Sequence, residues 1–395
     1  MKKGIKIADL RSTIIILCLW FSAFASLYSD TANKIALYIA LPIAFCLCLI
    51  QQKRAIDNKY FKILLALIIW IFFSYLWAQY KDTAIVQLKQ LLGTFILAYI
   101  YKISSQDVKV TPYLYITYIV LFISACIYAR NNILIEMVSE TDRLDDDKLN
   151  ANTLAYFLFY ATFALFELKR FVKNRLANGL LEVGFILMIP VTFIIAILTA
   201  SRQVLIIQIP LIVILLYIRY IHGTKLFTKV VFSIVATVSI IMAVPYVSKV
   251  YEDSYLKTRN EIELNEDGRF LLLKDAIDVG NKNFPLGVGP ANYIHYSPNK
   301  LFSHNTYTEL YANEGIIGLG LYLWLILVFI KRQWKRYRVS RDKQYFIFFI
   351  FGITYLVDGL FYVFYPHLWL MGCFILVASH SEVYYREQPT VKLHK

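Results

Sequence analysis

Charged side chains are scarce in this sequence. They make up 17% of its 395 residues, whereas hydrophobic residues make up 58% and aromatic residues 16%. Soluble globular domains carry about 25% charged residues. The shortage of charge excludes an ordinary soluble domain, because a core of this size cannot hide so much apolar surface. We therefore expect the chain to be solvated by lipid.

Cysteine is also scarce, and its positions exclude redox and metal chemistry as the function. The five cysteines all fall inside apolar segments, where they behave as small hydrophobic residues. Their spacing predicts neither a disulfide framework nor a metal site. They are Cys18, Cys46, Cys48, Cys126 and Cys373.

What the sequence does contain is a series of long apolar segments. A helix needs about 20 residues to cross the roughly 30 Å of hydrocarbon in a bilayer. The sequence predicts an all-α integral membrane protein with a single polytopic domain over residues 1–395 and about twelve spans. The first span is expected to be retained, because no cleavage site follows it. The segments are 12–28, 34–50, 63–78, 88–101, 112–129, 152–168, 180–199, 203–220, 227–247, 305–330, 345–365 and 368–383.

Lysine and arginine collect in alternate loops, which predicts the orientation of the chain. Basic short loops stay on the cytoplasmic side of a membrane. Both termini are then predicted to be cytoplasmic. The net charge of +14 is explained by this topology and by a surface that attracts anionic lipids, and less well by nucleic-acid binding. The densest basic cluster is Lys331, Arg332, Lys335, Arg336, Arg338, Arg341 and Lys343.

Two loops on the opposite side are longer than the rest. The acidic one covers about 130–151, and the larger one covers 248–304, between the ninth and tenth spans. Long loops in a compact protein commonly carry function. Within the larger loop, 268–279 predicts a short amphipathic helix, and the apolar turn 284–290 is expected to fold back against the protein. We expect the larger loop to carry part of an active site.

Two arginines are predicted at this outer surface. Arg202 ends the short turn 199–202 between the seventh and eighth spans, where it is either an interfacial anchor or an anion clamp. Arg269 begins the predicted amphipathic helix, where free backbone amides and a guanidinium together suit a phosphate oxygen. An exposed loop arginine is the alternative interpretation.

A histidine is predicted where the tenth span enters the membrane. His304 precedes an Asn305 cap and has Glu309 in the first turns, so the helix N-terminus favours a neutral imidazole that can accept a proton. An ordinary polar cap is the alternative. At helical spacing His304 would share a face with Gly315 and Gly318, which would permit close helix packing.

These segments resemble the motifs of one enzyme family. His304-Asn305, nine residues and then Gly315-x-x-Gly318 resemble the signature of the O-antigen ligase and O-antigen polymerase family. Arg269 with Leu273 resembles its second motif, and the turn 199–202 resembles its arginine turn. The segment 285–293 resembles its outer-loop segment. The likeness extends over about 143–358, in motif order and in predicted membrane position.

The resemblance implies a GT-C-like membrane fold and a glycosyltransferase without nucleotide or metal cofactor. A saccharide would move from undecaprenyl pyrophosphate to an acceptor sugar hydroxyl. Arg202 and Arg269 would stabilise the departing pyrophosphate, and His304 would be the base. Direct displacement would invert the anomeric carbon, since no paired carboxylates argue for a covalent intermediate. The supporting residues would be Asn305, Glu309, Gly315, Gly318 and Asp358.

Several alternatives stay open at this point. Asp358 either takes part in the site or pairs with an arginine to hold the helix bundle. The motifs do not separate a ligase, which delivers glycan to lipid A-core in lipopolysaccharide biosynthesis, from a polymerase that extends a lipid-linked O-antigen or capsule repeat. A lipid-linked oligosaccharide transporter fits less well, because the two halves show no repeat. Each interpretation places the chain in the bacterial cytoplasmic (inner) membrane, with its site on the periplasmic side.

The predicted orientation can be tested by cysteine labelling in a variant without native cysteines. Lys300→Cys should react with a membrane-impermeant maleimide in spheroplasts, because Lys300 lies in the large outer loop. Arg341→Cys should react only after permeabilisation. The reverse labelling pattern would contradict the topology.

Overall fold

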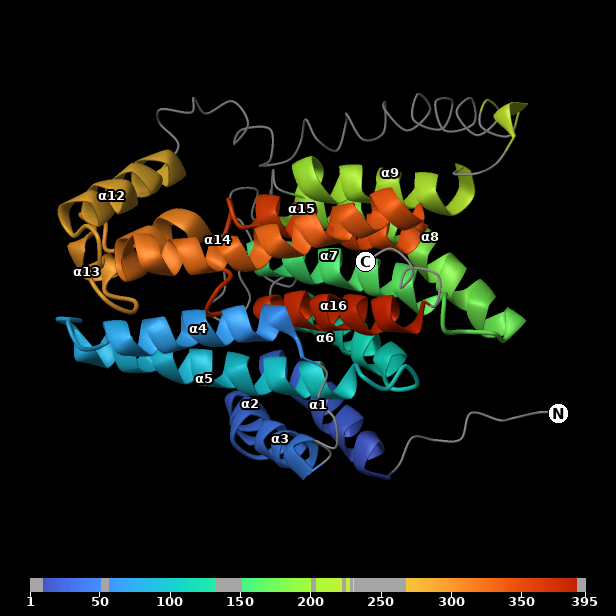
Figure 1. Ribbon diagram of the computed structural model, residues 1–395, viewed down its shortest axis with the longest axis horizontal. Helices are drawn as coiled ribbons and strands as arrows, with labels where there is room; N and C mark the ends of the chain where they lie inside the picture. Colours follow the sequence, from blue (N-terminus) through green and yellow to red (C-terminus); the bar gives the residue numbers. More distant parts are fainter. Residues whose placement is uncertain are drawn as a thin grey trace. The chain divides into compact units, whose positions relative to one another are not determined.

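The computed structural model describes residues 10–50, 57–132, 151–199, 204–221, 225–227, 230 and 268–388. Every regular element in this part of the chain is a helix, which confirms the predicted all-α class (Figure 1). The chain divides into two compact units. One is formed by Met1–Leu121 with Leu264–Lys395, and the other by Phe122–Glu263.

The helices overlap the predicted spans in position, but the number of twelve spans stays a prediction. Each predicted segment overlaps a helix except 227–247, of which the structure describes only residues 227 and 230. Among the described residues, six helices are long and apolar enough to cross a membrane, and two shorter apolar helices cover Thr153–Leu168 and Ile206–Ile221. The six are Leu10–Tyr28, Asp30–Ile50, Lys81–Ser104, Thr111–Arg130, Arg175–Ala196 and Thr306–Ser340. A multi-pass membrane protein is the architecture that these helices support.

The first unit contains both ends of the chain. Its N-terminal helices are α1 (Leu10–Tyr28), α2 (Asp30–Ile35), the π-helical turn η1 (Ala36–Ala40), α3 (Leu41–Ile50), α4 (Lys59–Ser74), α5 (Lys81–Ser104) and the first half of α6 (Thr111–Asn132). Its C-terminal helices are α12 (Gly268–Lys282), α13 (Tyr293–Tyr296), α14 (Thr306–Ser340), α15 (Lys343–Asp358) and α16 (Leu368–Glu387).

Helix α16 forms the core of this unit. It packs against α4, α5 and α15, and it is buried from Trp369 to Val383 (Figure 1). A helix that is apolar around its circumference is stable only when neighbours surround it. Its polar groups are matched by side chains of other helices: the Asn58 amide donates to Ser379 Oγ at 2.7 Å, and the Gln333 amide donates to Ser381 Oγ at 3.0 Å.

A buried ion pair links α14 to α16. Arg336 Nη2 lies 3.0 Å from the Glu382 carboxylate, and each side chain is only 6% exposed. Arg332 approaches the same carboxylate at 3.1 Å, and Arg336 also donates to the Ser381 carbonyl at 3.2 Å. Arg336 belongs to the densest basic cluster of the sequence. That cluster is therefore partly a structural element of the bundle and not only a lipid-facing surface.

Helix α14 is broken at Gly315. The backbone there has φ 66° and ψ −166°, a combination that is essentially restricted to glycine. The expectation that His304, Gly315 and Gly318 lie on one continuous helical face is therefore wrong. His304 itself lies outside the helix with φ 54°, and the break changes the register between the two ends of α14.

The loop that follows α12 fills this break. The Gly289 N–H donates to the Asn313 carbonyl at 2.7 Å, and the Val288 N–H donates to the Ala312 carbonyl at 2.9 Å. In return, the Ile316 N–H donates to the Pro285 carbonyl at 3.0 Å. The loop thus supplies the hydrogen bonds that the interrupted helix lacks. The prediction that 284–290 folds back against the protein is confirmed.

The second unit contains the rest of α6, α7 (Ala151–Leu168), α8 (Arg175–Thr199), and a continuous segment of η2 (Val204–Gln208), α9 (Ile209–Leu216) and η3 (Tyr217–Ile221). Arg219 lies between two aromatic rings, 4.9 Å from the centre of Phe166 and 4.7 Å from that of Phe185. Its Nε is 3.5 Å from the Glu182 carboxylate, which also binds Lys169 at 2.6 Å. Cation–π contacts and shared charge therefore fix these helix ends together.

Gly315→Ala tests how strongly the break in α14 is required. A Cβ at this position would overlap the Pro285 carbonyl, and the backbone conformation is unfavourable for alanine. We expect the substitution to destabilise the protein by about 1–3 kcal/mol and to lower its thermal midpoint in detergent. Gly320→Ala is the matched control on the same helix, because nothing lies within 4 Å of its added Cβ. Equal midpoints for the two variants would contradict this account.

Candidate functional site

His304 lies at the entrance of α14, one residue before the helix cap. Its ring centre is 4.2 Å from that of Phe302, and its side chain is partly exposed. The next residue, Asn305, caps α14 by accepting hydrogen bonds from the Tyr307 N–H at 2.9 Å and the Thr308 N–H at 3.2 Å. The predicted Asn305 cap is confirmed. The imidazole is consequently presented beside the N-terminus of α14.

The segment after α15 holds this helix entrance in place. The Thr306 N–H donates to the Gly359 carbonyl at 2.8 Å, and its hydroxyl donates to the Tyr362 carbonyl at 2.6 Å. The Asn305 amide donates to the Leu360 carbonyl at 3.2 Å. These bonds satisfy polar groups on both segments and fix the backbone at the cap. His304 is therefore attached to a rigid support.

Asp358 lies next to the segment that holds the start of α14. It is the last residue of α15, is 1% exposed, and directly precedes Gly359. A Cβ at Gly359 would contact the ring of Tyr307, which shows how closely α14 and the end of α15 approach. Of the predicted supporting residues, Asp358 and Asn305 are thus brought into one region with His304.

Glu309 is buried below His304 and connects the cap to the loop that fills the helix break. Its carboxylate accepts a hydrogen bond from the Ser303 N–H at 2.7 Å and another from the Asn313 amide at 3.2 Å. The Asn313 side chain in turn accepts a bond from the Tyr293 N–H at 2.7 Å. Glu309 therefore determines the backbone position of the residue that precedes His304.

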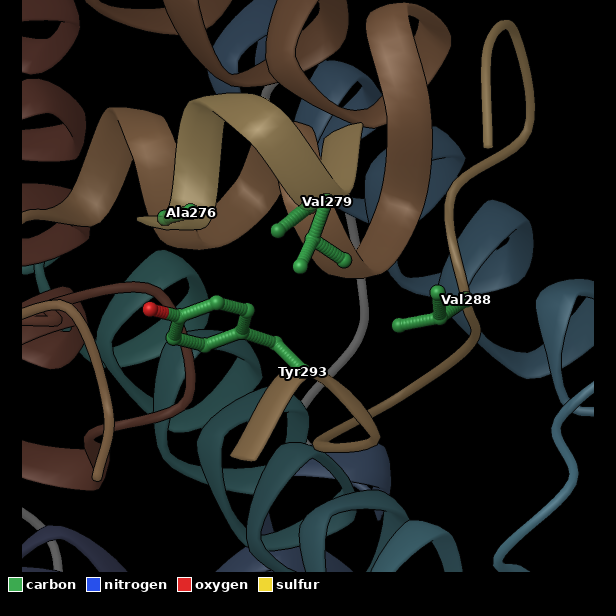
Figure 2. Packing of buried hydrophobic residues seen from close by; sticks show 5 residues of the cluster. Ala276, Val279, Val288 and Tyr293 are labelled. Carbon is green, nitrogen blue, oxygen red and sulfur yellow. The ribbon is translucent and has the colours of Figure 1, made fainter. Parts of the chain in front are cut away.

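Helices α12 and α13 pack onto α14 through a small apolar cluster of Ala276, Val279, Val288, Tyr293 and Ala312. Figure 2 shows the Tyr293 ring below α12, facing Ala276 and Val279, with Val288 at the side. The Tyr293 hydroxyl donates to the Leu272 carbonyl at 3.0 Å. Burial raises the pKa of Tyr293 to about 12, so this hydroxyl remains a donor at physiological pH.

The predicted amphipathic helix is confirmed as α12, which begins at Gly268. Arg269 is its second residue, as the sequence predicts, but the described structure does not extend to the Arg269 side chain. Arg202 lies outside the described residues, between α8 and η2. The meeting of the two arginines with His304 therefore stays a prediction.

The two predicted glycines have different roles from one another. Gly315 provides the break in α14. A Cβ at Gly318 would lie 2.3 Å from the Glu314 Cβ and 3.4 Å from the Trp70 ring of α4, so Gly318 leaves room for Glu314 and for the neighbouring helix. The Trp70 indole also donates to the Glu314 carbonyl at 2.9 Å, a carbonyl next to the break. Both glycines thus serve the geometry of the helix that carries Asn305 and Glu309.

A cavity of about 320 Å³ opens beside Glu309. Its walls come from the first turns of α5, from Ala291 and α13, from α14, and from the segment 363–366. The polar side chains that line it are Thr83, Gln87, Gln90, Glu309 and Tyr365. Apart from Glu309, sequence reasoning did not select these residues, since single polar residues in apolar helices carry no motif.

From the sequence, Asn292 was included only as part of the outer-loop motif 285–293, and Asn313 was not selected. Asn292 accepts a hydrogen bond from the Tyr80 N–H at 2.7 Å and donates to the Tyr80 carbonyl at 3.1 Å, which attaches α13 to the start of α5. Asn313 connects α14 to Tyr293. A signal was present in both cases, because a buried amide in a membrane protein normally has a specific partner.

Comparison with known proteins gives one finding on the family. No curated protein matches the chain. A family model described as O-antigen ligase matches residues 183–323. The matched range contains both predicted arginines, the cap of α14 and the two glycines that shape that helix. The predicted resemblance to the O-antigen ligase and polymerase family is thereby confirmed over residues 183–323.

Proposed function

We propose that this protein is an O-antigen ligase. It transfers a saccharide from undecaprenyl pyrophosphate to a sugar hydroxyl of lipid A-core on the periplasmic side of the cytoplasmic membrane. The observation that carries the proposal is the position of His304 at the capped, rigidly supported entrance of α14, within the segment that matches the family model. The twelve-span GT-C-like architecture is part of the proposal.

His304 acts as the general base. As the acceptor oxygen attacks the anomeric carbon, the imidazole takes the hydroxyl proton, and the bond between that carbon and the pyrophosphate oxygen breaks. The partial exposure of the side chain and its position at a helix N-terminus support this role. Displacement in one step inverts the anomeric configuration.

Arg202 and Arg269 bind the pyrophosphate and stabilise the charge that grows on it. A guanidinium offers paired donors to phosphate oxygens, and it performs the role that a divalent cation has in other transferases. Arg269 lies in the first turn of α12, where the helix N-terminus adds its own favourable potential for an anion. We propose that the reaction needs neither a metal nor a nucleotide.

Asp358 and Glu309 are positioning residues in this scheme. Glu309 holds the Ser303 N–H at 2.7 Å, and Asp358 precedes the carbonyl that accepts the Thr306 N–H. Both therefore act on the backbone that flanks His304.

His304→Ala should reduce saccharide transfer by about 10²–10⁴-fold while leaving the protein inserted in the membrane, because the base is lost and the cap residue Asn305 is kept. Mass analysis of the product made by purified protein measures the effect. Asn299→Ala is the control, since it changes an exposed side chain of the same segment. Unchanged transfer by the His304 variant would contradict the proposed base.

Arg202→Lys and Arg269→Lys should each lower transfer by about 100-fold, because an ammonium cannot reproduce the paired donors of a guanidinium. The comparison variant is Arg338→Lys, a conservative change near the far end of α14. If Arg202→Lys or Arg269→Lys were as active as Arg338→Lys, that arginine would not be part of the site.

The same assay separates the related activities. A ligase forms lipid A-core that carries the glycan, a polymerase forms a longer lipid-linked glycan, and a transporter forms no covalent product.

A further inference from the structure

The cavity beside Glu309 has the features of a ligand site that the reaction scheme has not used. Its volume of about 320 Å³ is at the lower end of the range for small-molecule sites, about 300–1,000 Å³. This size suits one or two sugar rings better than a long polymer. Its polar lining consists of amides, hydroxyls and one carboxylate, which are the groups that bind sugar hydroxyls.

Gln87, in the wall of the cavity, has a polar atom whose hydrogen-bonding capacity is unused. Its side chain is 4% exposed and its amide N–H donates to the Tyr365 hydroxyl at 2.6 Å. Its Oε1 atom is buried and has no hydrogen-bond partner among the described residues. A buried carbonyl oxygen without a donor costs about 1–3 kcal/mol. A ligand hydroxyl in the cavity would supply the missing donor.

Exposed aromatic rings lie next to Thr83, one of the residues that line the cavity. Tyr80 is 40% exposed and stacks on His295, with ring centres 3.9 Å apart and an interplanar angle of 20°. Tyr296 meets Tyr80 edge to face and is 38% exposed. His295 lies 3.2 Å from the Thr83 hydroxyl, which lines the cavity. Flat apolar ring faces next to hydrogen-bonding groups match a sugar ring, which has C–H faces and a hydroxyl edge.

The cavity is linked to the proposed base through Glu309. Glu309 forms part of its wall and binds the backbone of Ser303, which directly precedes His304. In the predicted topology the start of α5, the segment 291–294 and the segment 363–366 all lie on the same outer side as His304. A sugar bound in the cavity would therefore reach the base from the water-facing side.

We propose that this cavity, lined by Gln87, Gln90, Thr83, Glu309 and Tyr365, binds a neutral sugar ring of the acceptor glycan. Its identity as a saccharide site stands on the cavity, and its assignment to the acceptor rests on the proposed function. Gln87 Oε1 and Glu309 accept hydrogen bonds from sugar hydroxyls, and Tyr80 and Tyr296 face the ring.

Binding can be measured without any donor lipid by saturation-transfer NMR. The full-length protein is reconstituted in phospholipid nanodiscs, because maltoside detergents would compete for a sugar site. The probes are free glucose, galactose and N-acetylglucosamine. We expect saturation transfer to the ring protons of at least one of them, with affinity reduced about threefold to tenfold in Gln87→Leu and in Gln90→Ala, which each remove one hydrogen-bonding group.

Two controls make the result specific. Gln106→Ala removes an amide beyond the opposite end of α5, where its side chain donates to the Lys102 carbonyl, and should bind like the unmodified protein. Gln90 is exposed, so its variant should fold even if Gln87→Leu does not. Absence of saturation transfer from the unmodified protein to all three sugars, or equal affinity in the cavity variants and Gln106→Ala, would overturn the proposal.

Transfer assays keep this failure distinct from failure of the proposed function. His304→Ala should lose transfer and keep sugar binding. If the cavity variants bind sugar more weakly and the unmodified protein transfers no saccharide to any acceptor, the cavity remains a sugar site and the acceptor assignment falls with the proposed function. If transfer occurs with an unchanged KM for the acceptor in Gln87→Leu and Gln90→Ala, the cavity proposal is wrong and the proposed function stands.

Discussion

The insertion of the loop 284–290 into the break of α14 is the interaction on which the rest of the candidate site depends. A helix interrupted inside apolar surroundings leaves carbonyl and N–H groups without partners, and such groups are costly in a bilayer. The loop satisfies them through Gly289, Val288 and Pro285. Because the loop joins α12 to α13, the break also fixes where those two helices lie relative to the entrance of α14.

This arrangement turns a helix that is long and apolar enough to span a membrane into a support for the candidate site at its N-terminal end. Before the break, α14 carries Glu309, is capped by Asn305 and is held by the segment after α15. After the break it continues as a long helix whose far end is paired with α16. The two halves can therefore satisfy different packing requirements, and the N-terminal half follows the loop and α13 more than the helix bundle.

Local features of the site were predictable from the sequence. The Asn305 cap, the start of α12 and the inward fold of 284–290 each follow from residue types within a few positions of one another. Gly315 was recognised, but its role was misassigned, because a glycine in a helical pattern predicts close packing as readily as a break. Arg336 was grouped with surface charges because its partner Glu382 lies on another helix. The partners of Gln87 and Asn313 could not be predicted, since the contacts that define these residues join separate segments. The positions of Arg202 and of the Arg269 side chain stay predictions.

The central position of α16 has a consequence for biogenesis. This helix is the last one described in the chain, yet α4, α5 and α15 all pack against it, and Glu382 on it neutralises a buried guanidinium of α14. Helices emerge from the ribosome in sequence order, so the earlier ones must remain in the membrane without their common partner until α16 has been synthesised. During that interval Arg336 has no counter-ion from α16, and a chaperone, lipid head groups or the translocation machinery must accommodate its charge.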